Sequence, residues 1–163
     1  SMLRPGREPE DPCDVDACRE SALRLLDAAD RPSGALRDRL IDKGYDDETV
    51  AAVVDRLIEV GLVDDESYAQ SAVRYCVGRL MGYRGAVMEL ARKGVDRPLA
   101  ERVCDEARMS GVFEDAAWEL GRRSAAKTQG MDPKVRKRRF WSSGGRKGHD
   151  AETLRAVAHE LFD

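Results

Sequence analysis

The chain has 163 residues, of which 36% are charged, 42% are hydrophobic and only 6% are aromatic, and its formal net charge is −3. No stretch approaches the roughly 18 consecutive apolar residues of a membrane-spanning helix, so we expect no membrane segment. The sequence contains 20 Ala and 14 Leu but only 2 Ile and 3 Thr, a usage that favours helices over sheets.

The four cysteines and two histidines do not form a recognisable metal-binding or redox motif. Cys13, Cys18, Cys76 and Cys104 lack the paired Cys/His spacing of zinc sites. We therefore expect free thiols in a reducing, cytoplasmic setting. The first twenty residues contain no apolar segment of the secretory type, which agrees with that location. No phosphate-binding glycine loop or catalytic set is recognisable, so we expect neither a cofactor nor an enzyme.

The first segment, residues 1–14, is acidic and rich in proline. Pro5, Pro9 and Pro12 interrupt it, and it shows no hydrophobic periodicity. A segment of this composition buries little apolar surface. We therefore expect a disordered or loosely attached acidic tail.

One motif recurs three times in the remainder of the chain. It occurs as Lys43-Gly44-Tyr45-Asp46, as Lys93-Gly94-Val95-Asp96 and as Lys147-Gly148-His149-Asp150. Apolar residues follow each copy at steps of three and four, which places them on one face of a helix. Glycine supplies the left-handed residue that ends one helix, and Asp caps the next. We interpret the motif as a turn between two helices, in which His149 is a packing residue.

A further amphipathic helix precedes each such pair. The sequence therefore predicts an all-α fold of tandem three-helix repeats, at residues 15–61, 62–111 and 112–163, in an elongated, curved arrangement. The third repeat departs from the pattern because Gly144 stands where the other two repeats have leucine. Because glycine weakens a helix, we expect the middle helix of this basic, partly degenerate repeat to be short or to end near Trp141.

The second repeat begins with three acidic residues, Asp64, Asp65 and Glu66. Clustered carboxylates can hold a metal ion, but helix capping by Asp64 explains this group without one. We therefore predict no metal site here.

At this point the sequence resembles the RecX family of bacterial recombination regulators. The resemblance is carried by the run Gly61-Leu62-Val63-Asp64-Asp65-Glu66 with Tyr68-Ala69 one residue further on, by Gly85 to Leu90, by the second copy of the turn motif, and by Leu36 and Leu40 before the first copy. It extends in register over about residues 20–163.

The resemblance implies a cytoplasmic, all-helical protein that takes part in recombination, DNA repair and the SOS response. Proteins of this family bind the RecA recombinase, lie along the groove of its filament on single-stranded DNA, and inhibit filament growth, strand exchange and ATP hydrolysis. They are not enzymes. For this chain we expect a monomer whose contact with single-stranded DNA is weak or dependent on RecA.

Positive charge is concentrated in the third repeat. Residues 122–147 contain ten basic side chains and one acidic residue, Asp132, although the whole chain is acidic. Such a segment favours contact with phosphates or with acidic protein surfaces, or it coats a solvated helix. We expect Trp141 to stack on bases or to pack in the core. The candidates for RecA or DNA contact are Arg122, Arg123, Lys127, Lys134, Arg136, Lys137, Arg138, Arg139, Arg146 and Lys147, with Arg74, Arg79 and Arg84 in the second repeat.

Two functions of other classes remain open. A stand-alone helical nucleic-acid-binding module would resemble helix-turn-helix domains in outline. The predicted third helices disfavour it, because their exposed positions carry acids: Asp55, Glu59, Glu101, Asp105 and Glu106. A small hydrolase or transferase would need a site that the sequence does not show.

Overall fold

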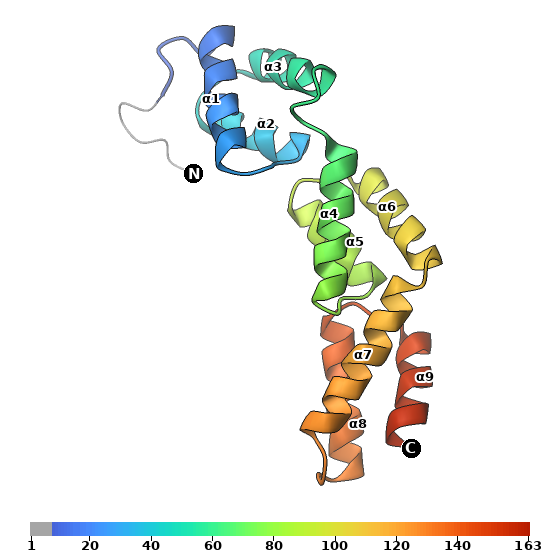
Figure 1. Cartoon of the computed structure of the whole chain (residues 1–163). Helices are drawn as coiled ribbons and strands as arrows, with labels where there is room; N and C mark the ends of the chain where they lie inside the picture. Colours follow the sequence, from blue (N-terminus) through green and yellow to red (C-terminus); the bar gives the residue numbers. More distant parts are fainter. Residues whose placement is uncertain (1–7) are drawn as a thin grey trace. The chain divides into compact units, whose positions relative to one another are not determined.

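A computed structural model describes residues 8–163, and this part of the chain contains nine α-helices and no strand (Figure 1). The predicted all-α class and the repeated three-helix units are therefore confirmed. None of the described helices combines the length and the apolar character needed to cross a membrane. The helices are α1 (Val15–Ala28), α2 (Ser33–Asp42), α3 (Asp47–Glu59), α4 (Asp65–Gly78), α5 (Tyr83–Arg92), α6 (Arg97–Met109), α7 (Val112–Lys127), α8 (Pro133–Arg146) and α9 (Ala151–Phe162).

The chain forms two compact units. The first comprises the described residues up to Ala69 together with the turn Lys93–Asp96, and the second comprises Gln70–Arg92 and Arg97–Asp163. Each unit has its own apolar core. In the first unit α1, α2 and α3 pack on one another, and in the second unit α6 packs on both α5 and α7, while α7, α8 and α9 form a trio.

The core of the first unit is built from one face of each of its first three helices. Leu36, Leu40, Val50 and Val54 are fully buried or nearly so. Their spacing of four residues within α2 and within α3 is what places them on the inward faces. Burial of this apolar surface supplies most of the stabilisation of the repeat.

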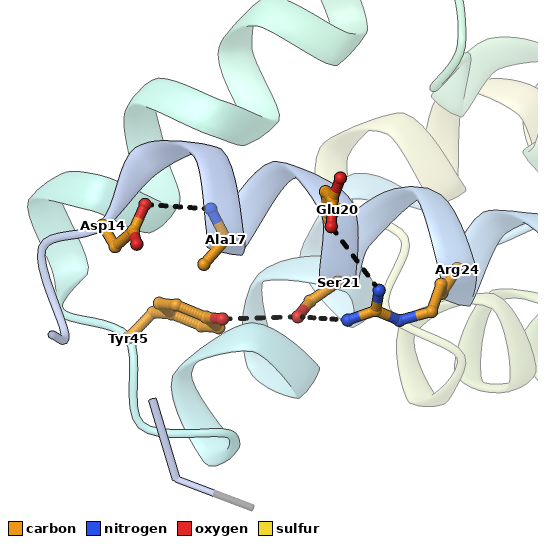
Figure 2. Close-up of polar contacts among 6 residues, drawn as sticks. All are labelled: Asp14, Ala17, Glu20, Ser21, Arg24 and Tyr45. Carbon is orange, nitrogen blue, oxygen red and sulfur yellow. Dashed lines mark hydrogen bonds and ion pairs between the residues drawn. The ribbon is translucent and has the colours of Figure 1, made fainter. Parts of the chain in front are cut away.

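Polar contacts connect α1 to the first turn motif, as Figure 2 shows. The Asp14 side chain caps α1 by accepting a hydrogen bond from the Ala17 backbone N–H, at 3.0 Å. The buried Tyr45 hydroxyl lies 3.4 Å from Ser21 Oγ, which also accepts a hydrogen bond from Arg24. The tyrosine of the motif therefore packs inward and keeps a polar partner.

Part of the predicted tail contacts the same turn. The Pro12 carbonyl accepts a hydrogen bond from the Asp46 backbone N–H at 3.0 Å, and the Cys13 thiol donates to the Asp46 carboxylate at 2.9 Å. These contacts hold the residues immediately before α1 against the first repeat. The remainder of the predicted tail, residues 1–7, lies outside the described residues.

The three turn motifs have the predicted backbone. Gly44, Gly94 and Gly148 have φ values of 109°, 103° and 83°, in the left-handed region that favours glycine. The Asp46 side chain caps α3 through Thr49, as predicted. Asp150 occupies the N-cap position of α9, but its side chain makes no capping hydrogen bond, so the predicted capping role is wrong for this copy.

The expectation that the middle helix of the third repeat is short or ends near Trp141 is wrong, because α8 has 14 residues. Helix α8 continues through two serines and two glycines to Arg146. The reason is packing between helices: Gly144 is buried, and a Cβ atom there would collide with the Leu154 side chain of α9. Glycine thus permits a close approach of the two helices, and this contact offsets its low helix propensity.

Candidate functional site

The described residues offer no metal centre, because residues 8–163 contain no group of three or more His, Cys, Asp or Glu side chains that could hold an ion.

His149 is 3% exposed, and its Nε2 lies 2.8 Å from the Leu80 carbonyl oxygen. Burial lowers the pKa of His149, so the neutral imidazole donates to that oxygen. The predicted packing role of His149 is confirmed.

Two of the predicted contact residues hold the third repeat together instead. Arg136 donates to Thr128 Oγ1 at 3.1 Å and to the Ala125 carbonyl at 3.0 Å, and its guanidinium lies 5.3 Å from the centre of the Phe162 ring. Lys137 forms an ion pair with Asp163. Both cations therefore bind groups of the third repeat itself.

Four other predicted contact residues are exposed but have local partners. Arg122 and Arg123 both pair with Glu119, at 3.4 and 3.3 Å. Arg74 donates to Ser71 Oγ at 3.0 Å, and Arg84 donates weakly to the His149 carbonyl at 3.4 Å. Exposed contacts of this kind contribute little to stability, so they leave these side chains available.

Lys134, Arg138 and Arg146 are exposed on α8 and make no ion pair within residues 8–163. Their side chains are free to meet an external anion.

The four remaining predicted cations lie, together with Arg123, around one concavity in the second unit, which we call the basic pocket. These four are Arg79, Lys127, Arg139 and Lys147. It encloses about 490 Å³ between the turn after α4, the end of α7 and the middle of α8. Among the described residues, five cations and three hydroxyl groups line it, and no carboxylate does. The lining residues are Gly78, Arg79, Leu80, Leu120, Arg123, Ser124, Lys127, Thr128, Arg139, Ser143 and Lys147.

Helical spacing explains much of this convergence. Arg123 and Lys127 are four residues apart on α7, and Arg139 and Ser143 are four residues apart on α8, so each pair lies on one face of its helix. Because α7 and α8 pack together, the two faces border the same concavity.

The turn Arg79–Leu80 forms a third side of the basic pocket, and two side chains of the third repeat hold its backbone in place. Lys147 Nζ donates to the Arg79 carbonyl at 2.7 Å, and His149 donates to the Leu80 carbonyl. Leu80 has a φ of 63°, which is unusual for a residue with a side chain. These two hydrogen bonds hold the strained backbone in place.

Comparison with known proteins identifies the family. The model of the first three-helix domain of RecX matches residues 18–57. The regulatory protein RecX of Thermobifida fusca (strain YX) is 37% identical over 147 residues, which cover 88% of this chain and 78% of that protein. This chain belongs to the RecX family.

Other relatives of the RecX family agree with this assignment. The regulatory protein RecX of Streptomyces lividans is 32% identical over 163 residues, covering 99% of this chain and 85% of that protein. The crystal structure of RecX from Lactobacillus salivarius has a TM-score of 0.80 at 20% identity, over 91% of this chain and 96% of that one. A second crystal structure, of a regulatory protein RecX, has a TM-score of 0.76 at 18% identity, over 89% of this chain and 73% of that one. These two structures show that the fold is shared.

Trp141 of this RecX-family chain is half-buried and packs against the core of α7, α8 and α9, next to the fully buried Phe140.

Sequence reasoning did not single out the hydroxyl groups of the basic pocket, which come from Ser124, Thr128 and Ser143. The four-residue step from Arg139 to Ser143 is the signal that could have found one of them.

Proposed function

We propose that this chain binds RecA filaments on single-stranded DNA and inhibits their growth, their recombinase activity and their ATP hydrolysis. The observation that carries the proposal is its membership of the RecX family, whose relatives are named regulatory proteins. In this proposal the chain acts as a cytoplasmic monomer, needs no cofactor and catalyses no reaction. Its effect on RecA comes from occupying a surface of the filament.

Charge distribution supports a role for the third repeat in that contact. Lys134, Arg138 and Arg146 are exposed on α8 without ion pairs among the described residues, and the basic pocket gathers five more cations. A filament on DNA offers phosphates and acidic protein surfaces to such groups. Contacts with phosphates of this kind carry no sequence preference, which suits a regulator that acts anywhere along a strand.

The alternative, a stand-alone nucleic-acid-binding module, needs a basic recognition helix. The third helices of the first two repeats instead expose acids, and several of these pair with arginines on the same helix. Arg56 pairs with Glu59 on α3, and Arg102 pairs with Glu106 on α6. Helices of this charge do not enter a DNA groove readily, and we therefore favour the regulator.

The test adds the protein to RecA on single-stranded DNA and follows ATP hydrolysis together with filament length by electron microscopy. We expect slower hydrolysis and shorter filaments, with an effect that saturates with protein concentration. Binding to naked duplex DNA is measured in parallel, because the alternative predicts tight duplex binding without RecA. Unchanged hydrolysis and unchanged filament length would contradict the proposed function.

A further inference from the structure

We propose that the basic pocket binds backbone phosphates of single-stranded nucleic acid directly, without RecA. The inference deepens the proposed function and rests on it for the choice of ligand, while its evidence is the local chemistry of the pocket.

The first argument is uncompensated charge. Five cations line the pocket, and no carboxylate is among the lining residues. Lys127 and Arg139 make no ion pair within residues 8–163, and Arg123 has only an exposed pair with Glu119. Arg123 and Lys127 also repel each other, because like charges four residues apart on a helix are unfavourable. A bound anion would remove this repulsion.

The second argument is the supply of hydrogen-bond donors. The Ser124 and Ser143 hydroxyls are half-buried in the pocket and make no hydrogen bond within the described residues. The acceptors nearby are already engaged, since Lys147 and His149 donate to the carbonyls of Arg79 and Leu80. The pocket therefore offers cations and hydroxyl donors together, which is the set that phosphate oxygens accept.

The third argument concerns which phosphate ligand fits. Within residues 8–163 no aromatic ring lines the pocket, and Leu80 and Leu120 are the only large apolar residues that do. A nucleotide site would normally add an apolar or aromatic surface for the base. Contacts with phosphates alone suit a nucleic-acid backbone, and a flexible single strand reaches a recessed group of cations more readily than a stiff duplex does.

The test measures binding of labelled oligothymidylate to the protein alone, by fluorescence anisotropy over a range of salt concentrations. The pocket variant carries Lys127→Gln and Arg139→Gln. The matched control carries Arg39→Gln and Arg155→Gln, two exposed arginines outside the pocket without ion pairs among the described residues. Both double variants remove two positive charges, so only a local effect distinguishes them. Circular dichroism verifies that each is folded.

We expect the pocket variant to bind at least about tenfold more weakly at low salt, as loss of charge-assisted hydrogen bonds predicts. The slope of log affinity against log salt should fall by about 1.4, at about 0.7 for each lost contact with a single strand. Equal weakening in the two variants, or no binding by the unsubstituted protein at low salt, would overturn the inference. Displacement of the oligonucleotide by ATP at equal phosphate concentration would assign the pocket to nucleotides and would also overturn it.

Inhibition of RecA by the unsubstituted protein is measured on the same preparations, which separates the two proposals. If inhibition is present but the pocket variant binds the oligonucleotide normally, the pocket inference is wrong and the proposed function stands. If the pocket variant loses oligonucleotide binding but the unsubstituted protein never inhibits RecA, the proposed function is wrong and the phosphate site stands.

Discussion

Gly148 lies against Gly85 so closely that a Cβ atom on either glycine would collide with backbone of the segment that carries the other. The Lys147 carbonyl, next to Gly148, accepts a hydrogen bond from the Gly82 backbone N–H at 2.8 Å. The same contact occurs within the first unit, where a Cβ on Gly94 would lie 2.7 Å from the Ala35 backbone nitrogen. In both cases the turn motif of one repeat meets the start of the middle helix of the repeat before it.

This contact predicts that Gly85→Ala destabilises the protein, although alanine favours helices. The new Cβ would press on the Lys147 carbonyl and displace it from Gly82. We expect a loss of about 1–3 kcal/mol in the free energy of unfolding, measured by urea denaturation. The control is Gly78→Ala at the end of α4, where nothing lies within 4 Å of the new atom, and it should be neutral or slightly stabilising. Equal stability of the two variants would contradict the close contact.

The parts of the fold that depend on local chemistry could be predicted from the sequence. Gly44, Gly94 and Gly148 end their helices in the left-handed region, because this requirement depends on a few neighbouring residues. The length of α8 could not be predicted in the same way. It depends on Leu154, ten residues after Gly144, and on how closely two helices approach.

The contact between Gly144 and Leu154 can be tested by a double-mutant cycle. Gly144→Ala should destabilise the protein by about 1–3 kcal/mol, because the added methyl group collides with Leu154. In the background of Leu154→Ala the same substitution should cost much less, since the space is then empty. Gly145→Ala is the control, because nothing lies within 4 Å of its added atom, and helix propensity predicts a gain of about 1 kcal/mol. Additive effects of the first two substitutions would show that they do not touch.

The basic segment of residues 122–147 could be identified from the sequence. Which of its cations bond within the protein and which line the basic pocket could not. Arg136 and Arg139 are three residues apart on α8, yet one donates to Thr128 and Ala125 while the other lines the basic pocket. The difference depends on which neighbouring helix each side chain faces. Only the packing of α7 and α9 on α8 determines this.

These contacts predict that substitution of Arg136 destabilises the protein and that substitution of the exposed Arg138 does not. Arg136→Met removes two hydrogen bonds and leaves the Ala125 carbonyl without this donor, so we expect a loss of about 1–3 kcal/mol in the free energy of unfolding. Arg138→Met, at an exposed position on the same helix, should change it by less than about 0.5 kcal/mol. Thermal and urea unfolding of both variants measure the difference. Similar stabilities would show that Arg136 is not a structural residue.

The four cysteines should differ sharply in reactivity. Burial raises the pKa of Cys18 to about 11 and that of Cys104 to about 12, so both remain protonated thiols at neutral pH. Cys76 is also buried, whereas Cys13 is exposed. We therefore expect iodoacetamide to modify only Cys13 in the folded protein, as read by mass spectrometry.

The hydrogen bond from Cys13 to Asp46 raises the pKa of Cys13, so its reaction should be slow for an exposed thiol. Asp46→Asn should accelerate the reaction, because the nearby negative charge is removed. Modification of two or more thiols before unfolding would contradict the burial of the other three.

The buried imidazole of His149 predicts that stability depends on pH in a defined range. Its pKa in the folded protein is lowered by burial, so the unfolded chain binds a proton first as the pH falls below about 6.5. Stability should therefore be undiminished above this value and should decline as the pH falls toward the lowered pKa. Charging the ring is further disfavoured by the nearby positive charge of Lys147, which also lowers the pKa of His149.

Urea denaturation between pH 5 and pH 7.5, compared for the unsubstituted protein and for His149→Gln, measures this effect. The glutamine variant should be less stable at pH 7.5 but should lose less stability on acidification, because it has no proton to gain at this position. The exposed His159 is present in both proteins, so its contribution cancels. Parallel pH profiles of the two proteins would show that folding does not lower the pKa of the His149 imidazole.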